Sequence, residues 1–195
     1  DARTTADGTA TTVRATTTWP STTLSAFPPT TVAPTTTRPA PTTCSAMGMS
    51  RDLPPQPELP APVAATRQAI VDAAVTCDWD ALRALAAVAG DEFVASFGGM
   101  EPLGLWQSGE PSPNGPLRAM VIVLRAPYRS SEFEQGLLYG WPEAFWADPL
   151  TDAHRLPVAE LYSQDTWDRF RQGDGYGGYR AVIKSDGTWT AFVEG

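Results

Sequence analysis

Aromatic side chains gather in one short stretch of this sequence, LYGWPEAFWAD at residues 138–148. Tyr139, Trp141 and Trp146 lie there within eight residues, around a glycine and a proline. An exposed ring can stack on a sugar or grip a peptide, and tryptophan is a favoured anchor residue at binding sites. Small domains also rely on such rings for burial, which favours core packing as the alternative. Tyr139, Trp141 and Trp146 are therefore the candidate binding residues.

Two carboxylates and the chain's one histidine give a candidate hydrolytic site. Glu143 and Asp148 belong to the aromatic stretch, and His154 follows it. Glycosidase chemistry needs two carboxyl groups roughly 5–10 Å apart across a cleft, which spacing along the sequence does not establish. A serine or cysteine nucleophile would have to use His154, but no G-x-S-x-G motif is present. TDAHRLP is typical of a polar connection before a helix, where a histidine is exposed or caps the helix.

The stretch GDGYGG at residues 173–178 matches the dinucleotide-binding pattern G-x-G-x-x-G letter for letter. That pattern binds a pyrophosphate only where a strand precedes it and a helix follows. Here a helix is expected before it and a strand after it, so we predict a glycine-rich turn and no cofactor. Two cysteines and one histidine, far apart in the chain, give no metal site either.

Cys44 and Cys77 are the only cysteines of the chain. A lipid anchor needs an apolar segment before the cysteine, and Cys44 follows RPAPTT. A disulfide between the two remains, closing a loop of 34 residues and contributing about 3–4 kcal/mol to stability. The alternative is two free buried thiols in a cytosolic protein, whereas the bridge predicts an oxidising, extracytoplasmic compartment.

Residues 1–43 contain 17 threonines and 6 prolines and few large apolar residues. Such a segment buries too little apolar area to fold, so we expect a disordered stalk, with an unselected terminal tail as the alternative. Extended at ~3.1 Å per residue, the stalk would reach roughly 130 Å. Because the chain starts at Asp1 without an initiator methionine, we also expect that a signal peptide has been removed; a lipid anchor upstream of Asp1 stays open.

The rest of the chain, from residue 44, carries 20 acidic and 11 basic residues. This net charge of −9 repels phosphate groups, so nucleic acid and anionic lipid are not expected partners. No window approaches the ~18 apolar residues of a membrane span, and no transmembrane segment is expected.

Hydrophobic periodicity predicts helices over residues 62–89, broken near Cys77 with Asp78 as N-cap, and over residues 116–124, capped by Asn114. Residues 156–173 should be helical in two pieces, closed by Gly173, and PEAFWAD should form a helical turn or two.

Two segments, EFVASF and FEQGLLY, are predicted as strands of a small sheet. The C-terminal segment predicts a hairpin with the three-residue loop Ser185-Asp186-Gly187 and Gly187 left-handed. That loop pairs Ile183 with Trp189 and Tyr179 with Val193. The fold class is therefore α+β, a small single domain with its helices packed on an antiparallel sheet.

Three pieces of the sequence, FVASFGG, YGWPEAFWA and GYGGYRAVIKSDGTWTAFVEG, resemble a family of actinobacterial secreted proteins and lipoproteins. The resemblance covers about residues 60–195 and leaves the stalk outside. It implies an envelope location and a threonine/proline spacer. The family has no activity from which a catalytic residue could be carried over.

The sequence thus predicts a stalk over residues 1–43, an extended proline-rich segment over 44–61 stapled by the disulfide, and an α+β domain over 62–195. The expected function is a secreted or envelope-anchored, non-catalytic binding or interaction module. Its expected partner is a cell-wall glycan or an envelope protein. The alternative is a small secreted hydrolase acting on cell-wall polymers through Glu143 or Asp148, with His154 nearby.

Overall fold

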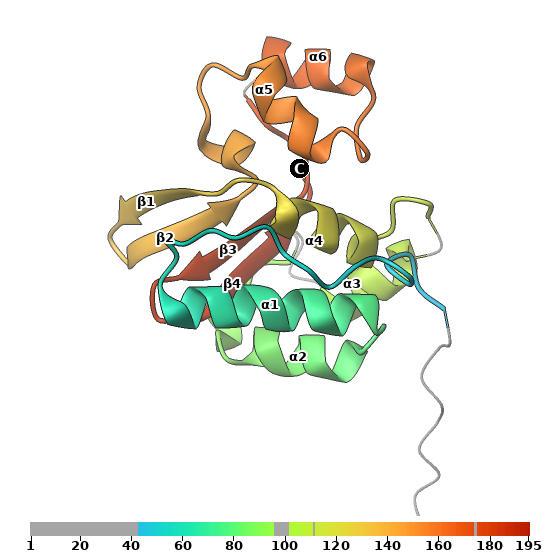
Figure 1. Cartoon of the computed structure of the whole chain (residues 1–195), viewed down its shortest axis with the longest axis vertical. Helices are drawn as coiled ribbons and strands as arrows, with labels where there is room; N and C mark the ends of the chain where they lie inside the picture. Colours follow the sequence, from blue (N-terminus) through green and yellow to red (C-terminus); the bar gives the residue numbers. More distant parts are fainter. Residues whose placement is uncertain (1–42, 96–101, 111, 174) are drawn as a thin grey trace, which may run out of the picture. The chain divides into compact units, whose positions relative to one another are not determined.

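The computed structural model of the chain describes residues 43–95, 102–110, 112–173 and 175–195 (Figure 1). These residues belong to one unit of the chain, residues 38–195. Helices combined with a four-stranded antiparallel sheet confirm the α+β class. Apart from Thr43, the predicted stalk lies outside the described residues, and its disorder stays a prediction.

The first two helices form as predicted, with a break at Cys77. Helix α1 (Ala61–Val75) buries its apolar face, and Asp78 caps helix α2 (Trp79–Ala87) by accepting the backbone N–H of Ala81 at 2.9 Å. Cys77 itself has φ = 56°, a left-handed conformation that ends α1 and turns the chain into α2.

Helix α4 (Pro116–Arg125) is the centre of the core. Eight of its ten residues are buried, and it packs against α1, helix α3 (Pro102–Gly109) and the sheet. The prediction of Asn114 as its N-cap is wrong, because Gly115 holds that position and Asn114 Nδ2 donates to the carbonyl of Leu161 at 3.3 Å.

Ser45, which is distant in sequence, and Glu110, in the segment just before the helix, cap α4 instead. The backbone N–H of Arg118 donates to Ser45 Oγ at 3.0 Å, and that of Leu117 to Glu110 Oε2 at 3.2 Å. Glu110 Oε1 also accepts the backbone N–H of Ser45 at 2.5 Å. A β-carbon on Gly115 would lie 2.8 Å from Ser45 Oγ, so only glycine allows this approach.

The sheet has the order β1-β2-β3-β4, with every neighbouring pair antiparallel. Its strands are β1 (Arg129–Phe133), β2 (Gly136–Trp141), β3 (Arg180–Lys184) and β4 (Trp189–Val193). The prediction of one strand over FEQGLLY is wrong, because a tight turn divides that segment between β1 and β2. Of EFVASF, Glu92 ends the 3-10 helix η1 (Gly90–Glu92), and Val94 forms an isolated parallel bridge to Ala191. The last two residues of the predicted strand lie outside the described residues.

The C-terminal hairpin has the predicted loop, with Gly187 at φ = 92° and Ile183 opposite Trp189. The predicted pairing of Tyr179 with Val193 is wrong, because Val193 pairs with Arg180. A β-bulge shifts the register next to Ile183 and places Phe192 opposite Ala181. This shift buries the Phe192 ring on the same face as Trp189, where the regular register would have put Ala191.

Short helices follow β2 and lead to β3. They are the 3-10 helix η2 (Glu143–Trp146), α5 (Asp152–Arg155), the 3-10 helix η3 (Leu156–Val158) and α6 (Gln164–Gln172). The predicted helical turn at PEAFWAD and the two helical pieces ending before Gly173 are thereby confirmed. Figure 1 shows α5 and α6 above the sheet and α1 and α2 below it. Within the described ranges, no helix has the length and apolar character needed to cross a membrane.

Candidate functional site

The predicted disulfide is present between Cys44 and Cys77, whose Cα atoms lie 5.8 Å apart. It fixes one end of the segment at residues 44–60, which we call the strap, and the strap runs back along α1 (Figure 1). Arg67 of α1 donates to the carbonyls of Leu124 at 2.8 Å and of Pro54 at 3.3 Å. Gln56 Nε2 donates to the carbonyl of Ala126 at 2.9 Å, so the strap is bonded to α1 and to the end of α4.

Two of the three predicted binding residues are part of the core beneath the strap. Tyr139 is 6% exposed and Trp141 is fully buried, with its Nε1 donating to Gln56 Oε1 at 3.3 Å. The guanidinium of Arg67 lies 5.9 Å from the Trp141 ring centroid, and burial lowers the pKa of Arg67 to about 10. Trp141 therefore joins the strap and α1 to the sheet, and neither ring is exposed to a ligand.

Trp146, the third predicted residue, lies on the other face of β2. Successive residues of a strand point to opposite faces, so Gly140 points away from the core that Tyr139 and Trp141 enter. A β-carbon on Gly140 would lie 2.7 Å from the Trp146 ring, which shows how closely the indole rests on the strand. The ring stacks on Phe145 at 4.9 Å between centroids and stays partly exposed. Arg129 donates to the Trp146 carbonyl at 2.9 Å and holds η2 against β1.

Beside Trp146 the surface is hollowed, with a volume of about 660 Å³. Four rings line this aromatic hollow, Phe145 and Trp146 from η2, Phe170 from α6 and Tyr176 from the glycine-rich turn. Among the described residues, the charged side chains of its lining are Asp148, Arg171 and Arg180. Residues more than 30 positions apart in the sequence thus meet at one site.

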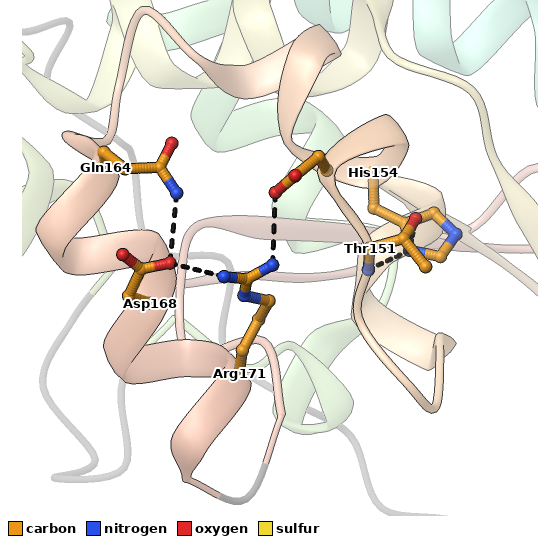
Figure 2. A network of polar contacts seen from close by, with 6 residues as sticks. Thr151, His154, Gln164, Asp168 and Arg171 are labelled. Atoms are coloured by element: carbon orange, nitrogen blue, oxygen red, sulfur yellow. Dashed lines mark hydrogen bonds and ion pairs between the residues drawn. The ribbon is translucent and has the colours of Figure 1, made fainter.

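The guanidinium groups of the hollow are held in place by their neighbours. Arg180 lies over the Phe145 ring at 4.9 Å from its centroid, and burial lowers the pKa of Arg180. Arg171 is fixed by two carboxylates, at 2.7 Å from Asp168 Oδ1 and 3.3 Å from Asp152 Oδ1. Figure 2 shows Gln164 donating to the same Asp168 carboxylate, at 3.0 Å.

The glycine-rich turn contributes Gly173, Gly175 and Tyr176 to the lining of the hollow and has the predicted context, a helix before it and a strand after it. Tyr176 donates to the carbonyl of Tyr179 at 2.9 Å, and Tyr162 Oη accepts the Tyr179 N–H at 2.6 Å. A β-carbon on Gly178 would lie 2.5 Å from Tyr162 Oη. Burial raises the pKa of Tyr162 to about 12 and also raises that of Tyr176. The turn's glycines therefore allow close packing.

The three candidate catalytic residues are not gathered at the hollow. Asp148 lines it, but Glu143 and His154 are not among its lining residues. His154 Nδ1 accepts the backbone N–H of Thr151 at 3.1 Å in a capping box of α5 (Figure 2), which confirms the interpretation as a capping histidine. Within the described ranges, no cluster of three or more histidine, cysteine or acidic side chains is placed to hold a metal ion.

Sequence reasoning missed most of the hollow. Phe170, Arg171, Tyr176 and Arg180 come from α6, the glycine-rich turn and β3, which no local pattern connects to Trp146. The one available signal was the density of aromatic residues on both sides of the turn. Comparison with models of known protein families, with curated protein sequences and with solved structures gives no match for this chain.

Proposed function

We propose that the chain is an extracytoplasmic, non-catalytic binding module, displayed by the stalk at residues 1–43, whose working surface is the aromatic hollow. The observation that carries the proposal is the partly exposed Trp146 ring seated on Gly140 at the edge of a 660 Å³ hollow. Small-molecule sites are concave and combine rings with a few fixed polar groups, as here. The disulfide supports an oxidising compartment.

The hydrolase alternative draws no specific support from the geometry. Of its three candidate residues only Asp148 lines the hollow, and the Nδ1 atom of His154 is occupied by the Thr151 cap. Hydrolysis needs a general acid and a general base that both reach the substrate. Neither Glu143 nor His154 lines the hollow together with Asp148.

A binding screen of the full chain against cell-wall glycans, peptidoglycan fragments and envelope proteins tests the proposal, with the products followed by mass spectrometry. We expect binding without turnover, weakened by Trp146→Ala. Turnover that is lost in Asp148→Asn would show an enzyme, and binding that is insensitive to Trp146→Ala would place the working surface elsewhere.

A further inference from the structure

We infer that the aromatic hollow binds an uncharged saccharide, with Trp146 as the stacking ring. This inference rests on the proposed binding function and names its ligand class. A saccharide has C–H faces that lie against aromatic rings and hydroxyl edges that need hydrogen-bonding groups. Trp146, Phe145, Phe170 and Tyr176 supply the rings, and Asp148 and Arg171 supply polar groups in the same lining. A volume of about 660 Å³ is within the ~300–1,000 Å³ of small-molecule sites.

A cationic ligand fits this lining poorly. The face of Phe145 that could receive a cation already carries the guanidinium of Arg180, at 4.9 Å. An incoming ammonium group would therefore meet the positive charge of Arg180 at the ring that would otherwise attract it.

An anionic ligand is also disfavoured. Arg171 is already in contact with the carboxylates of Asp152 and Asp168, which offset its charge. Asp148 adds an exposed carboxylate to the lining itself. The chain from residue 44 has a net charge of −9, so its long-range field repels anions as they approach.

An uncharged, hydroxyl-rich ligand can use the same groups without these penalties. A carboxylate accepts from hydroxyls through two oxygens, and a guanidinium donates from a planar edge. Asp148 and Arg171 therefore offer complementary partners to neighbouring hydroxyls. Arg171 is held in one orientation by its two aspartates, which reduces the entropy lost when a ligand binds.

The lining offers no free strand edge to an extended peptide. Peptides that lie along a domain commonly add a strand to the free edge of a sheet. Among the strands, only β3 contributes to the hollow, through Arg180, and β3 is paired on both sides by β2 and β4. The rest of the lining comes from η2, the loop that follows it, the end of α6 and the glycine-rich turn.

Calorimetric titration of the full chain with size-matched tetrasaccharides tests this inference. The neutral probes are oligomers of glucose, mannose and N-acetylglucosamine. The charged probes are a chitosan tetramer, which is cationic, and an oligogalacturonate, which is anionic. We expect at least one neutral probe to bind, and both charged probes to bind about tenfold more weakly or not at all.

Variants locate the binding on the protein. Trp146→Ala and Arg171→Gln should each weaken binding by about tenfold, and Trp146→Phe, which keeps a ring, by less. Arg83→Gln is the matched control, because Arg83 also pairs with an aspartate three residues earlier on a helix, Asp80, but is not part of the hollow. Amide NMR spectra establish that each variant is folded.

Three results would overturn the inference: a charged probe that binds as tightly as the best neutral one, binding that Trp146→Ala and Arg171→Gln leave unchanged, or no binding of any neutral probe. If peptides or envelope proteins bind at the hollow while no saccharide does, the proposed binding function survives and the saccharide inference fails. If nothing binds at the hollow, both fail.

Discussion

At the scale of single residues, close packing explains positions that carry no local signal in the sequence. Gly140, Gly115 and Gly178 each lie where a β-carbon would come within 3 Å of a neighbouring side chain. Gly140 allows the Trp146 ring to pack directly on β2, and Gly115 allows Ser45 to approach and cap α4. Glu110 likewise carries no local signal in the sequence, and its carboxylate joins the strap to the central helix α4.

Glu110→Gln should lower the free energy of unfolding by about 1–2 kcal/mol. The carboxylate accepts from Ser45 and from the first turn of α4, where the helix dipole favours a negative charge. Urea unfolding measures the change, with Glu134→Gln, at the exposed β1–β2 turn, as the control. Equal stability of the two variants would show that Glu110 does not act as a cap.

Tyr162, whose ring contacts that of Tyr176 in the hollow, should make stability depend on alkaline pH. Burial raises the pKa of Tyr162 to about 12 from the ordinary value of 10, so only the unfolded chain ionises this group between those values. Stability should therefore be fully present below pH 10 and fall as the pH rises from 10 to 12, with a slope of about 1.4 kcal/mol per pH unit from Tyr162. Urea midpoints across this range should fall less steeply for Tyr162→Phe; equal slopes would contradict the assignment.

At the scale of elements, the sequence predicts what neighbouring residues decide and misses what distant ones decide. The α1–α2 break with Asp78 as N-cap and the three-residue C-terminal loop follow from local spacing, and both are present. One cap of α4 comes from Ser45, 73 residues before Arg118, and the pairing of Val193 depends on the burial of Phe192 in the core; neither follows from local spacing. Tyr139, Trp141 and Trp146 were predicted together from one stretch, but which of these rings face the core depends on the register of β2.

The packing of the Trp146 ring of η2 against Gly140 of β2 gives a prediction at this scale. Gly140→Ala should displace the Trp146 ring, because the new methyl group would lie 2.7 Å from the indole. We expect loss of ligand binding at the hollow with a stability cost of about 1–3 kcal/mol, typical of overpacking. Ligand titration and urea unfolding measure both effects. Ser130→Ala, at an exposed position of the neighbouring strand, is the control, and unchanged binding in Gly140→Ala would show that Trp146 does not shape the site.

At the scale of the whole molecule, the disulfide and the strap join α1, the end of α4 and the sheet. The bridge links the start of the strap to the α1–α2 turn, and the strap then reaches Arg67, Gln56 and the end of α4. Cys44 immediately precedes Ser45, the residue that caps α4. Covalent closure therefore supports both the strap and the central helix.

Replacing Cys44 and Cys77 together by serine should lower the free energy of unfolding by about 3–4 kcal/mol, through the entropy of the opened loop in the unfolded chain. Urea unfolding measures the loss, and reduction of the unaltered chain should reproduce it. A loss below about 1 kcal/mol would mean that the non-covalent bonds of the strap are sufficient without the bridge.

The binding surface itself is tested most directly by the indole N–H signals of the tryptophans in an NMR titration with solubilised cell-wall material. Trp146 is partly exposed at the hollow, whereas Trp106, Trp141, Trp167 and Trp189 are buried. The signal of Trp146, assigned with Trp146→Phe, should shift on binding while those of Trp106 and Trp189 stay in place. Binding that leaves the Trp146 signal unmoved would contradict the assignment of the hollow as the working surface.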